Sequence, residues 1–155
     1  MTGQDTSDRR SAHKIETRQA RLRLVTLAIL IVLIIQFALG ISVNLYVTLP
    51  AAGRPGHSDW FGNGPLLALH VAFGMFLVLA AIFVLVRAIT ARNAAVIVTS
   101  SAGLAAIIVA FFFGASFTDK LTNGYSLGMA IAFAVALGCY AVGLFAMSAA
   151  RRPKA

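Results

Sequence analysis

The stretch from Leu24 to Thr48 reads LVTLAILIVLIIQFALGISVNLYVT and contains no charged residue. At 1.5 Å per residue, an α-helix of this length reaches about 37 Å, which exceeds the roughly 30 Å of hydrocarbon in a bilayer. Because lipid offers backbone groups no hydrogen-bond partners, a run of this kind must be helical. The sequence therefore predicts a transmembrane helix over these residues.

Three more apolar stretches follow, at Pro65 to Val86, Ala94 to Phe117 and Tyr125 to Ala150. The composition agrees, since 59% of the residues are hydrophobic, 12% are charged and the mean hydropathy is +0.86, far outside the usage of soluble domains. We therefore expect an all-α membrane protein, a bundle of four transmembrane helices over residues 24–150. The lipid bilayer is its predicted surrounding.

The positions of lysine and arginine predict the orientation. Of 13 such residues, 11 lie in the amino-terminal segment, in the turn between the second and third stretches, or at the carboxyl end; the other two are Arg54 and Lys120. By the positive-inside rule both termini are cytoplasmic, in a bacterial plasma membrane. The net charge of +8 forms no interleaved basic patch, so nucleic acid is not an expected partner. A cleaved signal peptide is disfavoured, because the first apolar run is longer than a secretory one.

Three segments outside the predicted spans are polar. Residues 1–23 predict a disordered basic tail that becomes helical near Ile15 to Arg23 at the membrane surface, and residues 151–155 form a short cytoplasmic tail. The outer loop from Pro50 to Gly64 is rich in Gly and Pro, which excludes regular structure. Trp60 in this loop is expected at the headgroup level.

The two halves of the chain contain similar short stretches. Phe37 to Val43 matches Phe111 to Phe117, and Gly74-Met75 matches Gly128-Met129. Such a pattern favours a parallel repeat of two helical hairpins, related by an axis along the membrane normal. Chance similarity between apolar segments is the alternative.

Small residues at helical spacing predict where the helices pack, because they let backbones approach closely. The stripes of the third and fourth predicted helices face each other or a partner protein, and the pattern does not distinguish the two. The expected packing residues are Gly40, Gly74, Gly103, Ala110, Gly114, Gly128 and Ala132.

Polar residues inside the predicted spans are the candidates for function. Gln36, Gly40 and Asn44 share one face of the first helix, and His70 lies about 8 Å into the second. His70 is either a haem ligand, with Gly74 leaving room for a porphyrin edge, or a polar contact that donates to Asn44, Gln36 or a backbone carbonyl. A second histidine for a bis-histidine site is not found in the predicted spans.

Two resemblances extend this reading. The stretch Gly40 to Pro50, with Gly114 to Phe117, resembles small four-helix membrane proteins of actinobacteria, which implies the fold and the plasma membrane but no activity. Gln36, Gly40 and Leu67-Ala68-Leu69-His70 resemble half of a haem A synthase, which implies His70 as a haem ligand. The matching part of the fourth predicted helix, Gly124 to Gly128, has no histidine.

Other chemistries find little support. All five carboxylates lie outside the predicted spans, and no phosphate-binding loop or zinc-spaced cluster is present in the sequence. The sequence thus favours a protein without a catalytic site, a structural or accessory component of a homo-oligomer or larger membrane complex. The alternative is a haem-binding redox or haem-handling protein that uses His70.

Overall fold

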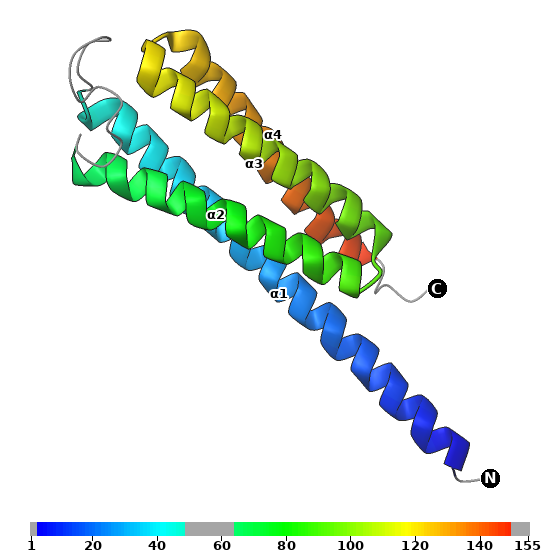
Figure 1. Cartoon of the computed structure of the whole chain (residues 1–155). Coiled ribbons are helices and arrows are strands. Elements are labelled where there is room, and N and C mark those ends of the chain that lie inside the picture. Colours follow the sequence, from blue (N-terminus) through cyan, green and yellow to red (C-terminus); the bar gives the residue numbers. More distant parts are fainter. Residues whose placement is uncertain (1–2, 49–63, 150–155) are drawn as a thin grey trace.

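The computed structural model describes residues 3–48 and 64–149, and this part of the chain forms four α-helices and no strand (Figure 1). Each helix contains a segment long and apolar enough to cross a membrane. The predicted class, an all-α protein with four membrane-spanning helices, is confirmed. Most of the predicted outer loop and the carboxyl-terminal tail lie outside the described residues. The helices are α1 (Gly3–Tyr46), α2 (Pro65–Thr90), α3 (Ala94–Lys120) and α4 (Asn123–Ala149).

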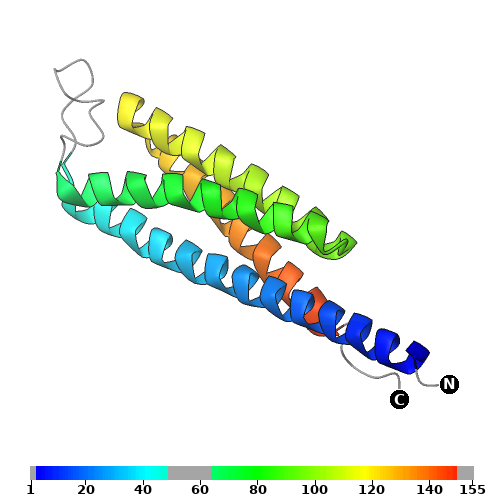
Figure 2. The ribbon, with the colours of Figure 1, turned by 60° about the horizontal axis from the view of Figure 1, so that its bottom comes forward.

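α1 begins much earlier than the predicted first span. It starts at Gly3 and includes the basic segment that the sequence assigns to a tail. Residues 15–23 contain Glu, Gln, Ala and three Arg, all strong helix formers, so the helix continues without an interruption into the apolar run. Figures 1 and 2 show α1 extending past the ends of the other three helices.

Local chemistry fixes the ends of the other helices. Pro65 opens α2, where its missing N–H is not needed. The Asn93 side chain accepts a hydrogen bond of 3.2 Å from the backbone N–H of Val96 and so caps the start of α3. α3 ends at Lys120, and its C-cap residue Leu121 has a left-handed φ of 50°. Only Leu121 and Thr122 separate α3 from α4, whereas the predicted spans leave residues 118–124 between them.

The four helices are arranged as two hairpins, α1 with α2 and α3 with α4 (Figures 1 and 2). α2 also packs against α3, and α1 against α4, whereas the diagonal pairs α1 with α3 and α2 with α4 are not in contact within the described residues. α1 and α3 run in one direction and α2 and α4 in the other. Any up-and-down bundle of four helices alternates in this way, so the internal repeat stays a prediction.

The closest packing is between α3 and α4. A Cβ atom added at Gly103 would lie 2.6 Å from the ring of Tyr140, one at Gly128 would lie 2.8 Å from the ring of Phe113, and one at Gly143 would lie 2.6 Å from Thr99. The small-residue stripes of the two helices therefore face each other within one chain. Ala110 and Ala132, two more predicted packing residues, are buried.

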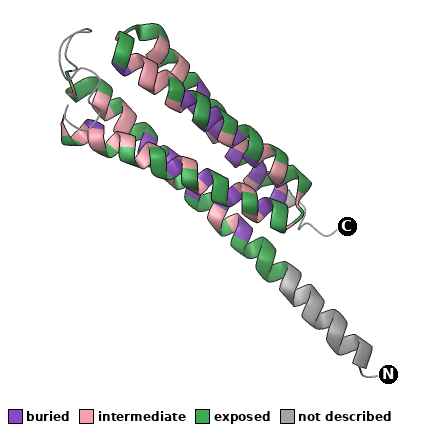
Figure 3. Ribbon diagram, viewed as in Figure 1, coloured by how far each residue is buried: buried purple, intermediate pink, exposed green. Residues whose placement is uncertain are grey.

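Apolar side chains from all four helices fill the middle of the bundle, which is the buried region between the hairpins in Figure 3. A smaller cluster lies towards the end of the bundle where α2 turns into α3. At this end the guanidinium of Arg23 donates a 3.1 Å hydrogen bond to Ser148 and joins α1 to α4. The central cluster consists of Ile29, Leu33, Leu77, Ala81, Val84, Ala106, Ile107, Phe133, Ala136 and Tyr140.

A methyl group at Gly103 tests the tight contact between α3 and α4. We expect Gly103→Ala to lower the free energy of unfolding by about 1–3 kcal/mol, because the new Cβ forces the Tyr140 ring out of a packed position. The measurement is unfolding of the detergent-solubilised chain with a denaturing detergent, followed by circular dichroism. Gly138→Ala is the control, since a Cβ there meets nothing within 4 Å. Equal stability of the two variants would contradict this packing.

Candidate functional site

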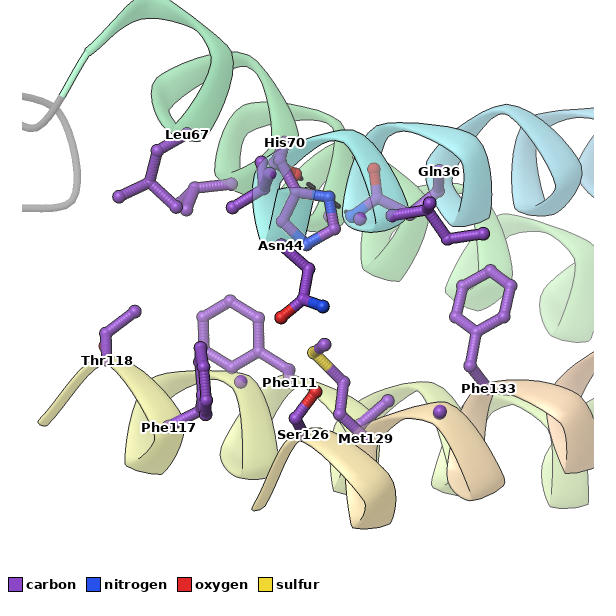
Figure 4. A pocket seen from close by; sticks show the side chains of 18 of the residues that line it. Gln36, Asn44, Leu67, His70, Phe111, Phe117, Thr118, Ser126, Met129 and Phe133 are labelled. Atoms are coloured by element: carbon purple, nitrogen blue, oxygen red, sulfur yellow. Dashed lines mark hydrogen bonds between the residues drawn. The ribbon is translucent and has the colours of Figure 1, made fainter. Parts of the chain in front are cut away.

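A cavity of about 710 Å³ lies between the two hairpins, in the half of the bundle away from the Arg23–Ser148 contact (Figure 4). All four helices contribute to its lining. Its volume falls within the range of roughly 300–1,000 Å³ that is typical of small-molecule sites. The walls are mainly apolar and carry a few polar side chains, which is the usual composition of such a site.

Aromatic side chains form much of the wall. Phe37 of α1 and Phe133 of α4 stack with their ring centroids 5.8 Å apart, at the side of the cavity nearest the central core. Phe111 and Phe117 of α3 line the opposite end (Figure 4). These rings offer broad apolar faces to a flat or hydrophobic ligand.

Gln36 links α1 to α2 at the edge of the cavity. Its side chain is only 7% exposed, and its Nε2 donates a 3.0 Å hydrogen bond to the backbone carbonyl of His70. A Cβ at Gly74 would lie 3.2 Å from the same Nε2, so the space at Gly74 receives the Gln36 amide. The sequence expected this space to accept a porphyrin edge. The other amide atom, Oε1, is buried and has no hydrogen-bond partner among the described residues.

The imidazole of His70 packs on α1 where Gly40 leaves room. A Cβ at Gly40 would lie 3.1 Å from Cε1 of the ring. Nδ1 is buried and has no hydrogen-bond partner in the described part of the chain, while another edge of the ring is directed towards the cavity and Asn44 (Figure 4). A polar contact joins the first two helices, but it differs from the predicted one, because its donor is Gln36 and its acceptor is the His70 backbone carbonyl. The imidazole itself is not used in it.

Asn44 lies on the same face of α1 as Gln36 and Gly40, one turn beyond Gly40, as the sequence predicts. Its side chain projects into the cavity beside His70 (Figure 4). Within the described residues no hydrogen bond joins it to His70. Gln36, Asn44 and His70 are thus brought together at one wall, where a ligand could meet two amides and an imidazole.

Met129 is a further site residue that was not predicted from the sequence. This side chain of α4 enters the cavity from the α3 and α4 wall, opposite His70 (Figure 4). Its sulfur lies close to α3, because a Cβ at Gly114 would approach Sδ to 3.1 Å. The internal repeat pairs Met129 with Met75, which is 53% exposed on α2 and does not line the cavity. Because its counterpart in the repeat lies outside the cavity, the repeat did not indicate that Met129 lines it.

The available groups define what the site can do. No group of three or more His, Cys, Asp or Glu side chains that could hold a metal ion occurs in the described residues. The described lining contains no carboxylate and no cysteine, and Cys139 lies away from the cavity. The polar groups present are an imidazole, a thioether, amides and hydroxyls. They suit the binding of a neutral or weakly polar ligand, or the ligation of a metal that the ligand brings with it.

Known proteins offer no guide to this site. Comparison with protein families, with curated proteins and with solved structures finds no match for the chain. The description of the site therefore depends on the chain's own residues. On these grounds the molecule is a multi-pass helical membrane protein with an apolar cavity that His70 and Met129 face from opposite sides.

A methyl group at Gly40 tests the placement of the imidazole. We expect Gly40→Ala to move the His70 ring, because the new Cβ would lie 3.1 Å from Cε1, closer than most carbon contacts. The measurement is the NMR spectrum of the chain with isotope-labelled histidine, with the His70 signal assigned from its loss in His70→Ala. Gly138→Ala is the matched control. Unchanged His70 signals in Gly40→Ala would show that the ring does not pack on Gly40.

Proposed function

We propose that this chain is a bacterial plasma-membrane protein that binds haem in the cavity between its hairpins, with His70 as an iron ligand. Its role is haem handling or electron transfer. The observation that carries the proposal is that the backbone and the side chain of His70 have different surroundings. Its backbone carbonyl makes the contact with α1, which leaves the imidazole at the wall of a cavity of about 710 Å³.

The residues present fit this group. Neutral imidazole is a common haem ligand, and the edge of the His70 ring that faces the cavity, not the buried Nδ1, is the part that iron could meet. Phe111, Phe117 and Phe133 supply apolar surface for the macrocycle. When bound, haem would supply a one-electron redox centre or a transferable cargo.

Gln36 is suited to position the imidazole. A histidine that ligates a metal usually donates its other ring N–H to a carbonyl or carboxylate, which fixes its orientation. Gln36 is already bonded to the His70 backbone, and its Oε1 is a buried acceptor without a partner among the described residues. Nδ1 as a donor and Oε1 as an acceptor are chemically complementary, although no hydrogen bond joins them in the described structure.

The second candidate is an accessory component of a membrane complex. The sequence favoured it on the expectation that the stripes of α3 and α4 meet a partner, but Gly103 and Gly128 pack inside the chain. What supports it now is the cavity between the hairpins, because a lipid chain or a side chain of a partner protein could occupy the same apolar space. A homo-oligomer would use other faces of the helices.

We further propose that the cavity opens in the half of the membrane away from the cytoplasm. Arg18, Arg21, Arg23, Arg87 and Arg92 belong to the other end of the bundle, where the α2–α3 turn and the start of the first span lie. The positive-inside rule assigns that end to the cytoplasm. The turn after Lys120 would then face outward.

If the chain binds haem, the purified protein absorbs visible light. We expect the full chain, purified in detergent from haem-supplemented cells, to show a Soret band and sharpened bands on reduction, because a bound porphyrin dominates visible absorption. His70→Ala should lose the Soret band. His57→Ala, which removes the histidine of the predicted outer loop, is the control and should keep it. A colourless wild-type protein with a co-purifying partner would favour the accessory role instead.

Reporter fusions test the orientation. Alkaline phosphatase, which is active only outside the cytoplasm, should be active when fused after Thr122 and inactive when fused after Arg92. The reason is that the basic turn at Arg92 stays in the cytoplasm. The reverse pattern would invert the topology and place the cavity in the cytoplasmic half of the membrane.

A further inference from the structure

We infer that the thioether of Met129 is the second iron ligand of this site, paired with the imidazole of His70 across the cavity. The inference rests on the haem-binding function proposed above and extends it. A bis-histidine site was the form that the sequence analysis considered and found incomplete. The structure places a different candidate for the second ligand, Met129, on the opposite hairpin.

The first support is the position of Met129 in the bundle. His70 belongs to α2 and Met129 to α4, and these diagonal helices are not in contact within the described residues. Both side chains line the same cavity, and Figure 4 shows the Met129 sulfur directed into it, towards the wall that holds Asn44 and His70. A ligand between the hairpins would therefore meet one donor atom from each side.

The second support is their depth. α2 and α4 begin at the same end of the bundle (Figure 1). His70 is the sixth residue of α2 and Met129 the seventh of α4. At 1.5 Å per residue they lie about 8 and 9 Å from the starts of their helices. The two donor side chains thus lie at a similar depth in the bundle, so one ligand between the hairpins could meet both.

The third support is an approximate symmetry: the sequence repeat pairs Gly40 with Gly114 but does not pair the side chains that pack on them, His70 and Met129. Gly40 lies six residues before the end of α1, and Gly114 lies six residues before the end of α3. A Cβ at Gly40 would meet the His70 ring at 3.1 Å, and a Cβ at Gly114 would meet the Met129 sulfur at 3.1 Å. Each hairpin therefore seats one donor side chain on the equivalent glycine.

The chemistry suits the pair. Among the residues that the structure describes around the cavity, Met129 is the only one that carries sulfur. Thioether and imidazole together ligate haem iron in other proteins and raise its reduction potential. Methionine also fills gaps in cores without any ligand, so a test must separate ligation from packing.

The test replaces Met129 with leucine, which removes the sulfur atom but keeps a similar side-chain volume. Full-length wild type, Met129→Leu and Met75→Leu are purified from haem-supplemented cells, and their absorption spectra, electron paramagnetic resonance and reduction potentials are compared. We expect Met129→Leu to keep the Soret band through His70 but to change from low-spin to high-spin iron, with a lower potential. Met75→Leu is the control, since Met75 is exposed outside the cavity, and should match the wild type.

Two outcomes would overturn the inference. A Met129→Leu protein that stays low-spin with the wild-type potential would remove Met129 from the iron while leaving haem binding intact. A wild type without haem would remove both proposals. If Met129→Leu does not fold, near-infrared magnetic circular dichroism of the oxidised wild type identifies the ligands directly. A thioether-to-iron signature supports the inference, and a bis-imidazole or high-spin signature contradicts it.

Discussion

The close approach of α3 and α4 is the contact around which the rest of the bundle is built. Helices in lipid gain no hydrophobic energy by associating, so they depend on packing, and packing needs small residues where backbones meet. Gly103 allows the ring of Tyr140 to lie against α3, and Gly128 allows the ring of Phe113 to lie against α4. α1 and α2 then pack on this pair through the central apolar cluster, to which all four helices contribute.

The same geometry creates the cavity. Large side chains such as Leu33 and Leu77 fill the middle of the bundle, whereas the half that contains the cavity has glycines at positions 40, 74 and 114 facing the space between the hairpins. Two of the three glycines seat a side chain that can bind a metal, and the third receives the Gln36 amide. Small residues thus serve two purposes here. Between α3 and α4 they bring backbones together, and around the cavity they hold polar or soft groups at its wall.

The polar groups of the site differ in how they are satisfied. Gln36 uses one amide group to hold α1 against α2, and the acceptor is a backbone carbonyl, not an imidazole. Nδ1 of His70 and Oε1 of Gln36 are buried without partners in the described structure, at a place where lipid and apolar side chains offer none. Buried polar atoms of this kind carry a free-energy cost, and in membrane spans they are commonly associated with function.

Length and apolar composition were sufficient to predict four spans, because a run of some 25 apolar residues in lipid has one stable backbone conformation. The first half of the site was also predictable. Gln36, Gly40 and Asn44 share a helical face by their spacing, and His70 stands out as a polar residue within a span. Helix ends were less predictable, as α1 shows by beginning at Gly3, because propensity alone does not mark where a helix leaves the membrane.

What the sequence by itself determined is therefore the set of spans, the basic end of the bundle and one wall of the site. Only the tertiary structure decided that the stripes of α3 and α4 meet each other, that the His70 imidazole takes no part in the hydrogen bond between α1 and α2, and that Met129 faces it across a cavity. The physical reason is that spacing along one helix fixes which residues share a face. Which face meets which neighbour depends on the packing of all four helices together.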